Sequence, residues 1–321
     1  MKAIVGTNYG GPDQLELKDM DTPRPGPTEV LVRVKASSLN PLDWHLMRAH
    51  PHVLRLQKGV RRPKQPILGV DFAGIVEEVG PDVTDRQVGD EVFGIATGSL
   101  AEYARAAIEE IASKPPDLSF EQAASLPVAG CTALQAVRDH GQLRPGQKVL
   151  VNGAAGGVGT LTVQVAKALG AEVTGVCSRA NAELVESLGA DSVIDYKTAD
   201  FTRQGRRYDL IIEAAGNRSL SDLRRALTAD GAVVLVGAAD GNWIGPLARP
   251  LAGALLSKFV RHRLTFFVAK VVPGDLQFLS ELVASGRLTP VVDRTYPLAA
   301  GADAMAYLEQ GHARGKVLVT P

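Results

Sequence analysis

The stretch VLVNGAAGGVGTLTVQVAKALGAEVTGVCSRAN, Val149–Asn181, decides the fold of this 321-residue chain. A run of β-branched residues predicts a strand, four glycines at 153, 156, 157 and 159 predict a tight turn, and an amphipathic helix and a second strand follow. Glycines at such a turn let the backbone approach a pyrophosphate, and the N–H groups of the helix terminus face the phosphates. The spacing is a variant of G-x-G-x-x-G, so a glycine-rich turn without a ligand is the alternative. The strand–helix–strand frame favours a dinucleotide site.

The end of the second strand indicates which dinucleotide would bind. In NAD-binding proteins an acidic residue at this point binds the adenosine ribose. This strand instead ends with Cys177, Ser178 and Arg179. The hydroxyl of Ser178 and the guanidinium of Arg179 suit a 2′-phosphate, and Tyr196 offers a third contact. We therefore expect NADP(H) as the cofactor, the alternative being an ordinary surface serine and arginine.

The regions on either side of this stretch predict two domains in an α/β chain. From Lys148 onward strands alternate with helices, which indicates a doubly wound parallel sheet. The first part is β-rich, with short strands such as EVLVRVKASSL and DFAGIVEEVG, and it suggests a small barrel or sandwich. Between them, SFEQAASLPVAGCTALQAV from Ser119 has an N-cap signature and a helical pattern. We place a first domain at residues 1–122, completed by 272–321, and a cofactor domain at 123–271.

The composition excludes several classes of function. Lys plus Arg and Asp plus Glu both number 35, so the zero net charge predicts no attraction to nucleic acid. Two widely spaced cysteines, Cys131 and Cys177, form no disulfide framework and fit a reducing compartment. The first residues lack the apolar core of a signal peptide, and no apolar stretch reaches bilayer-spanning length. We expect a cytoplasmic protein without stable membrane insertion.

Several segments together resemble the medium-chain dehydrogenase/reductase superfamily. They are PILGVDFAGIVEEVG, VGDEVFG, GSLAEYA, SLPVAGCTAL, AAGGVG, SLGADSVIDY, VVDRTYPL and GKVLV, and they span essentially the whole chain. The sequence is most similar to the quinone oxidoreductase and enoyl-reductase branch, which includes zeta-crystallin-like proteins. The resemblance implies a GroES-like catalytic domain, a Rossmann cofactor domain, and a homodimer formed through the last strands of the nucleotide-binding sheet.

The sequence also departs from the zinc-dependent members of that superfamily. Those members carry a Cys after an early strand, a Gly-His-Glu motif, and a four-cysteine structural lobe. Here the motif reads Gly69-Val70-Asp71, and no cysteine precedes Cys131. Valine cannot ligate a metal, and a catalytic zinc needs three N, S or O ligands. We therefore expect no metal site.

Without zinc, a quinone or an activated alkene is an easier hydride acceptor than a simple carbonyl, because charge delocalises into a hydroquinone or an enolate. The segment LNPLDWHLMR holds the catalytic candidates. Asn40 and Asp43 match the family's substrate loop, with Asn40 as a hydrogen-bond donor and Asp43 as an orienting group. His45 stands where relatives have a tyrosine and could supply a proton, although solvent is an alternative donor. Asn40 and Asp43 could also be simple turn formers.

The resulting hypothesis is a zinc-independent NADPH-dependent oxidoreductase acting on a small-molecule quinone or enone. The alternatives are an alcohol dehydrogenase-like carbonyl reductase and an NADPH-binding structural or sensing protein with little turnover. We assign no role to the basic loop 48–64 or to the apolar-basic segment 246–263. The residues expected to contact the cofactor are Thr132, Ala155, Gly156, Gly157, Val158, Ser178, Arg179, Tyr196, Ala215, Gly237, Ala238, Phe267, Val268 and Lys316.

Overall fold

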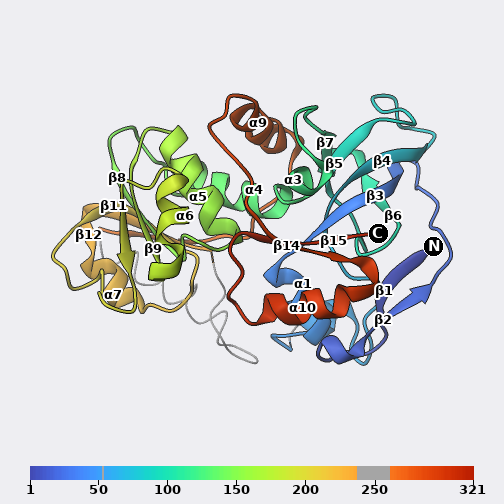
Figure 1. Ribbon diagram of the computed structural model, residues 1–321, viewed down its shortest axis with the longest axis horizontal. Helices are drawn as coiled ribbons and strands as arrows, with labels where there is room; N and C mark the ends of the chain where they lie inside the picture. The colour runs from blue at the N-terminus through green and yellow to red at the C-terminus, as the bar shows by residue number, and fades with distance from the viewer. Residues whose placement is uncertain (53, 237–260) are drawn as a thin grey trace. The chain divides into compact units, whose positions relative to one another are not determined.

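The computed structural model describes residues 1–52, 54–236 and 261–321, which form two compact units (Figure 1). Unit 1 consists of Met1–Cys131, Lys270–Ala284 and Pro290–Pro321. Unit 2 consists of Thr132–Ala269 and Ser285–Thr289. Both ends of the chain, blue and red in Figure 1, therefore belong to unit 1.

Unit 1 is built on a seven-stranded sheet in which only one neighbouring pair is parallel. A separate antiparallel hairpin, β1 (Lys2–Gly6) and β2 (Leu15–Asp19), precedes it in the chain. In pairing order the sheet contains β14 (Val292–Pro297), β15 (Lys316–Thr320), β3 (Glu29–Leu39), β4 (Asp71–Val79), β5 (Glu91–Ile95) and β7 (Ile111–Ser113), while β6 (Tyr103–Ala107) also pairs with β3.

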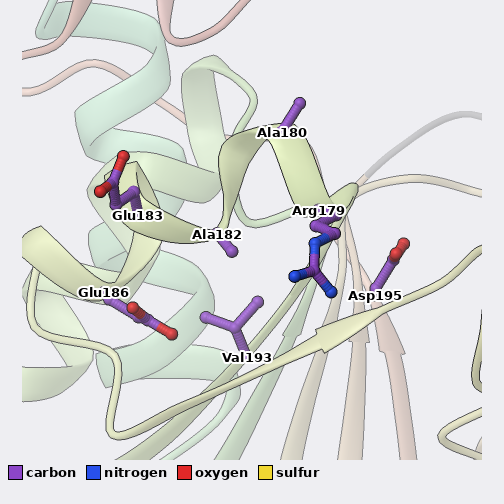
Figure 2. A pocket seen from close by; sticks show the side chains of 7 residues that line it. All are labelled: Arg179, Ala180, Ala182, Glu183, Glu186, Val193 and Asp195. Carbon is purple, nitrogen blue, oxygen red and sulfur yellow. The ribbon is translucent and has the colours of Figure 1, made fainter.

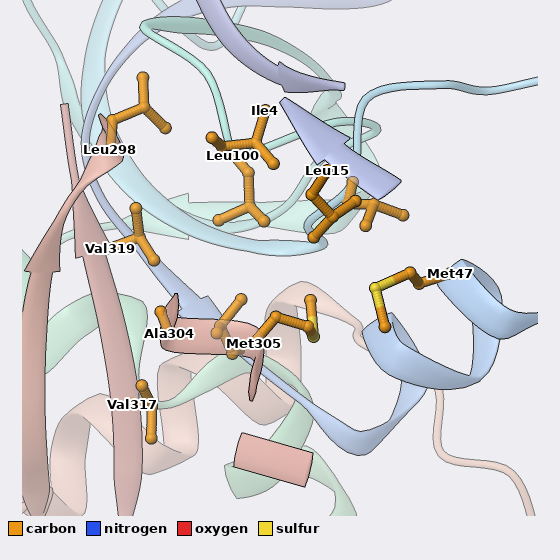
Figure 3. Packing of buried hydrophobic residues seen from close by; sticks show 11 residues of the cluster. Ile4, Leu15, Met47, Leu100, Leu298, Ala304, Met305, Val317 and Val319 are labelled. Carbon is orange, nitrogen blue, oxygen red and sulfur yellow. The ribbon is translucent and has the colours of Figure 1, made fainter. Parts of the chain in front are cut away.

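One hydrophobic cluster of unit 1 holds the first helix against the end of the sheet (Figure 3). Met47 comes from that helix, Met305 from a late helix, and Val317 from β15, and all three side chains are buried. Removing a large side chain from such a cluster costs about 2–5 kcal/mol.

The helices of this unit are α1 (Pro41–Arg48), α2 (Leu54–Lys58), α3 (Phe120–Ala124), α9 (Pro273–Ala284) and α10 (Gly301–Glu309), and α4 (Pro127–Gln135) runs on into unit 2.

Unit 2 contains the parallel sheet that the alternating pattern predicts, and this part of the expected fold is confirmed. Its helices include α5 (Gly157–Ala168), α6 (Ala182–Ser187) and α7 (Leu220–Arg225). The structure describes six strands in this sheet, and all neighbours among them are parallel; in spatial order they are β10 (Ser192–Asp195), β9 (Glu172–Cys177), β8 (Lys148–Asn152), β11 (Tyr208–Glu213), β12 (Leu227–Leu235) and β13 (Arg263–Phe266).

The order of these strands reverses at β8, since β9 and β10 lie on one side of it and β11 to β13 on the other. In open parallel sheets, ligands bind beyond the carboxyl ends of the strands at such a switch point. Leu150 of β8, Ile211 of β11 and Val233 of β12 are fully buried, so the centre of the sheet is the core of the unit. The sheet thereby presents its loops at one rigid edge.

The segment that begins at Ser119 forms two helices, α3 and α4, where the sequence predicts one. It begins as expected, and Ser119 accepts a hydrogen bond from the Gln122 amide in a capping box. It then breaks at Ser125, because the residue before a proline avoids helical geometry and Pro127 starts a new helix. That second helix continues into one π-helical stretch, Ala136–His140.

Candidate functional site

The segment that carries the catalytic candidates folds as helix α1 rather than as an open loop. Pro41 occupies the first helical position, where its missing N–H costs nothing. Asn40 is the N-cap, and its backbone N–H donates to Asp43 Oδ2 at 2.7 Å. Both residues are buried, with 3% of Asn40 and none of Asp43 exposed. Their arrangement is therefore fixed by the start of the helix.

The side chain of Asn40 belongs to a buried polar network that joins distant parts of unit 1. Its Nδ2 donates to Asp71 Oδ2 at 2.9 Å and to Ser38 O at 3.4 Å. Its Oδ1 accepts from Lys316 Nζ at 2.6 Å, and Lys316 Nζ lies 3.5 Å from Asp71 Oδ2. The backbone N–H of Val128 donates to the other Asp71 oxygen at 3.0 Å. The network thus brings together α1, α4, β4 and β15.

Burial controls the protonation of this network. Desolvation, helped by the neighbouring Asp71 carboxylate, raises the pKa of Asp43 to about 7, although a hydrogen bond from the Asn40 backbone N–H lowers it. Desolvation also raises the pKa of Asp71, an effect that Lys316 and Asn40 oppose. The pKa of Lys316 is lowered by burial. Asp43 Oδ1 is buried and makes no hydrogen bond among the described residues. A single ammonium therefore serves two buried carboxyl groups.

His45, the third catalytic candidate, lies on the same helix but outside this network. Its Nδ1 is 2.7 Å from the carbonyl oxygen of His50, which assigns a proton to Nδ1 because a carbonyl only accepts. Its ring stacks on Trp44 with the centroids 3.7 Å apart. The side chain is half-buried.

The glycine turn of unit 2 has the geometry that its sequence predicts. Gly153 adopts a left-handed φ of 89° directly after β8. A Cβ at Gly159 would lie 2.0 Å from Gly153 O, so this position requires glycine for the helix to pack on the turn. At Gly156, the N-cap of α5, the nearest atom to a Cβ would be 3.6 Å away. The first turn of α5 thus has open space beside backbone N–H groups that have no partner within the helix.

Several predicted cofactor residues lie at the same carboxyl edge of the sheet. Ser178 and Arg179 follow β9, Tyr196 follows β10, and Ala215 follows β11. Asp195 pairs in register with Cys177, which places these two strand ends side by side. The remaining members of this group, Ala155, Gly156, Gly157 and Val158, form the turn after β8 and the start of α5.

A pocket of about 490 Å³ opens beside Arg179, between α6 and β10 (Figure 2). Figure 2 shows the Arg179 guanidinium on the side of Val193 and Asp195. Arg179 is exposed and forms no ion pair among the described residues. Three carboxylates line the same pocket, so its charge is mixed: they belong to Glu183, Glu186 and Asp195.

The other predicted cofactor residues belong to several different elements. Lys316 lies in unit 1 with Asn40, whereas Thr132 lies on α4. Phe267 stacks on His140 with centroids 4.2 Å apart, and Val268 is 80% exposed just beyond β13. Gly237 and Ala238 lie outside the described residues, as does most of the segment 246–263.

Three buried polar residues carry no role in the sequence-based prediction. Asp71 directly follows the Gly69-Val70 pair that replaces the zinc motif, and Asn152 and Glu213 end the buried strands β8 and β11. A polar residue at the end of an apolar strand is a sequence signal that could have identified Asn152 and Glu213. Asp71 lacks this signal because it begins its strand. Among residues 1–52, 54–236 and 261–321, no group of three or more His, Cys, Asp or Glu side chains is arranged to hold a metal.

Comparisons with known proteins match both units. Residues 26–116 match the alcohol dehydrogenase GroES-like domain, and residues 188–319 match the zinc-binding dehydrogenase domain. The chloroplast envelope quinone oxidoreductase homolog of Arabidopsis thaliana is 34% identical over 347 residues, covering 100% of this chain and 98% of the relative. The NADPH-dependent alkenal/one oxidoreductase of the same plant is 34% identical over 340 residues, covering 100% and 80%.

The fold is also found among solved structures. The quinone oxidoreductase from Coxiella burnetii superposes with a TM-score of 0.88 at 32% identity, covering 100% of this chain and 99% of that one. The expected combination of a GroES-like unit and a parallel-sheet nucleotide-binding unit is therefore confirmed. In the part of the chain that the structure describes, no helix is both long and apolar enough to cross a bilayer.

Proposed function

Because the chain belongs to the quinone oxidoreductase branch of the medium-chain dehydrogenase/reductase superfamily, we propose that it transfers hydride from NADPH to a quinone or an activated alkene without zinc. The names of the relatives support an oxidoreductase that uses a nicotinamide cofactor. The choice of NADPH, the acceptor and the roles of individual residues are our proposal.

The observation that carries this proposal is the composition of the buried network in unit 1. It contains one ammonium, two carboxyl groups and one amide, from Lys316, Asp43, Asp71 and Asn40. These groups donate and accept hydrogen bonds and hold protons. Val70 occupies the position at which zinc-dependent members of the superfamily carry a histidine ligand, and a valine side chain cannot bind a metal. Such a site suits reactions whose charge delocalises in the acceptor, because they need positioned donors rather than a strong Lewis acid.

The glycine turn of unit 2 fits the pyrophosphate of a dinucleotide. The open space at Gly156 lets the backbone approach a phosphate closely, and the N–H groups of Gly157 and Val158 point from the N-terminus of α5. When bound, the reduced nicotinamide supplies the hydride. The residues assigned to the rest of the cofactor follow the neighbouring strands at the same edge.

The preference for NADPH rests on the end of β9. Ser178 and Arg179 stand there without an acidic residue, and a guanidinium binds a phosphate through paired hydrogen bonds. Asp195, at the end of the next strand, opposes this preference because its carboxylate lines the same pocket as Arg179. We therefore expect a measurable but moderate preference for NADPH over NADH.

Within unit 1, we assign a positioning role to Asn40. Its amide hydrogens are directed at Asp71 and Ser38, so its carbonyl oxygen serves to hold Lys316. Lys316 has three ammonium hydrogens, of which Asn40 and Asp71 account for two. We assign the third to a hydroxyl of the cofactor. Asp43 fixes the start of α1, and His45 supplies the proton that completes the reduction, with solvent as the alternative donor.

Purified protein tests this proposal through its consumption of NADPH. We expect turnover with a 1,2-quinone or a simple enone, with the same rate in the presence of a chelator. Activity on alcohols or simple carbonyls that the chelator abolishes would contradict the zinc-free reaction and favour a carbonyl reductase. Tight binding of NADPH without turnover of any acceptor would instead indicate a binding protein.

We further propose that the protein forms a homodimer through β13. Among the described residues this strand is at the edge of the parallel sheet; its last residue, Phe266, is 39% exposed, and Val268, two positions beyond the strand, is 80% exposed. A strand edge that pairs with no other strand in the described part of the chain, beside exposed apolar side chains, is a natural surface for sheet extension. Light scattering coupled to gel filtration should give twice the mass of 33.9 kDa. A cytoplasmic location stays a prediction.

A further inference from the structure

Glu213 joins the carboxyl ends of three neighbouring strands of unit 2. It ends β11, where it lies in register with Asn152 of β8 and Leu235 of β12. Asn152 Nδ2 lies 2.9 Å from each oxygen of the Glu213 carboxylate. Glu213 has no exposed surface and Asn152 only 3%. Because a buried carboxylate depends on its donors for stability, the pair constrains both strand ends.

Each strand end continues into a segment that we assign to the cofactor. Asn152 is followed by Gly153, the first residue of the glycine turn. After β11, the Gly216 N–H donates to Glu213 Oε1 at 2.7 Å and thereby folds the turn that contains Ala215 back onto the carboxylate. After β12, the Val236 N–H donates to the backbone carbonyl oxygen of Glu213 at 3.0 Å.

The first two segments also touch each other. A Cβ at Gly153 would lie 3.1 Å from the Ala215 nitrogen, so the two turns are packed backbone against backbone. Asn152 Nδ2 additionally lies 3.0 Å from Asn217 Oδ1. A change in the Asn152–Glu213 pair would therefore move the phosphate-binding turn and the turn after β11 together.

We propose that Glu213 and Asn152 are positioning residues for the nicotinamide cofactor, which hold the glycine turn and the 214–217 turn in their binding geometry without touching the ligand. This inference rests on the proposed use of NADPH. It goes beyond that function, because it states that a buried carboxylate–amide pair, and not the glycines alone, holds the backbone of the cofactor site in place. A residue that does not touch the ligand can still affect its affinity, because the groups that contact a ligand tolerate little displacement.

The pair can be tested by exchanging its members. In Glu213→Gln, an NH2 group replaces one of the two oxygens that accept hydrogen bonds from Asn152 Nδ2 and the Gly216 N–H. We therefore expect the dissociation constant for NADPH, measured by fluorescence, to rise about tenfold. The exchange Asn152→Asp with Glu213→Gln restores one acceptor and one donor between the strands. We expect it to bring the dissociation constant back to within about threefold of the wild type.

Gln164→Leu is the matched control, because Gln164 is a buried amide of unit 2 that binds the backbone of Thr289. It should lower the midpoint of thermal unfolding and leave NADPH binding unchanged. Equal weakening of binding by Glu213→Gln and Gln164→Leu at equal loss of stability would overturn the proposal, as would wild-type binding in Glu213→Gln.

If Glu213→Gln does not fold, Asn217→Ala provides the test. Asn217 is exposed, and its loss removes only the outer acceptor of Asn152, so we expect binding to weaken about twofold to threefold. Unchanged binding in this variant would then overturn the proposal. Failure of the wild-type protein to bind either NADPH or NADH would overturn the proposed function instead.

Discussion

Lys316 Nζ lies 2.6 Å from Asn40 Oδ1, although 276 positions separate the two residues. The contact joins the first residue of the last strand, β15, to the N-cap of α1. Both side chains are buried, so the bond is formed in a medium where an ammonium is costly unless it is paired. The candidate active site of unit 1 is therefore completed only when the end of the chain has folded against its beginning.

Lys316→Met should lower both stability and activity. It leaves the Asp71 carboxylate without its ammonium, and breaking a buried pair on one side costs about 3–5 kcal/mol. Adding Asp71→Asn removes the second charge, and the double variant should recover most of the free energy of unfolding but none of the lost kcat/KM for NADPH. Urea unfolding and steady-state kinetics measure the two effects.

Lys114→Met serves as the control for this prediction. Lys114 is a similarly buried lysine of unit 1, paired with Glu91 at 3.0 Å, and it lies outside the network. It should lose stability while its KM for NADPH stays unchanged. If Lys316→Met and Lys114→Met changed the kinetics equally, Lys316 would have no role in the site.

Gly156→Ala should separate cofactor binding from folding. Gly156 has φ of −81° and ψ of 176°, which alanine adopts freely, and the nearest atom to its Cβ would be 3.6 Å away. The methyl group would, however, occupy the space where a pyrophosphate approaches the backbone. We expect an unchanged unfolding midpoint and a dissociation constant for NADPH raised about tenfold or more.

Gly159→Ala should have the opposite balance. Its Cβ would meet Gly153 O at 2.0 Å, so the turn must open and we expect a loss of about 1–3 kcal/mol or more of stability. Thermal unfolding and fluorescence titration of both variants check the contrast. Wild-type affinity in Gly156→Ala would show that no phosphate binds at this turn.

The sequence predicts the local geometry of unit 2 better than the polar network of unit 1. Gly153 and Gly159 are explained by a turn whose requirements are contained within a few residues. The contact of Asn40 with Lys316 depends on the pairing of β15 with β3, and the spacing of residues along the chain does not predict that pairing. Asn40 and Asp43 can be predicted from the resemblance of their segment to the family, whereas the role of Asp71 depends on contacts with three residues that lie far from it in the sequence.

Arg179→Ala and Asp195→Asn should change cofactor preference in opposite directions. Loss of the guanidinium removes charged hydrogen bonds worth about 1.5–3 kcal/mol, so NADPH should bind roughly tenfold or more weakly while NADH changes little. Loss of the Asp195 carboxylate beside Arg179 should strengthen NADPH binding. Dissociation constants for both cofactors measure the effect. Equal weakening of NADPH and NADH by Arg179→Ala would mean that Arg179 does not bind the 2′-phosphate.

Asp43→Asn should flatten the dependence of stability on pH. The pKa of Asp43 is raised by burial to about 7 in the folded protein, whereas an Asp in an unfolded chain has a pKa of about 3.9. Between these values the folded protein keeps a proton that the unfolded chain has released. The free energy of unfolding contributed by Asp43 therefore falls as the pH rises from about 4 to 7, by at most about 1.4 kcal/mol per pH unit, and stays low above that range.

Asparagine at position 43 imitates the protonated acid, because its oxygen can still accept from the Asn40 N–H and it carries no charge. The variant should therefore gain stability relative to the wild type as the pH rises from 5 to 8. Urea unfolding across this range measures the difference between the two curves, in which the contributions of other titrating groups largely cancel. Parallel curves would show that Asp43 is ionised throughout, and that Lys316 neutralises it despite the cost of burial.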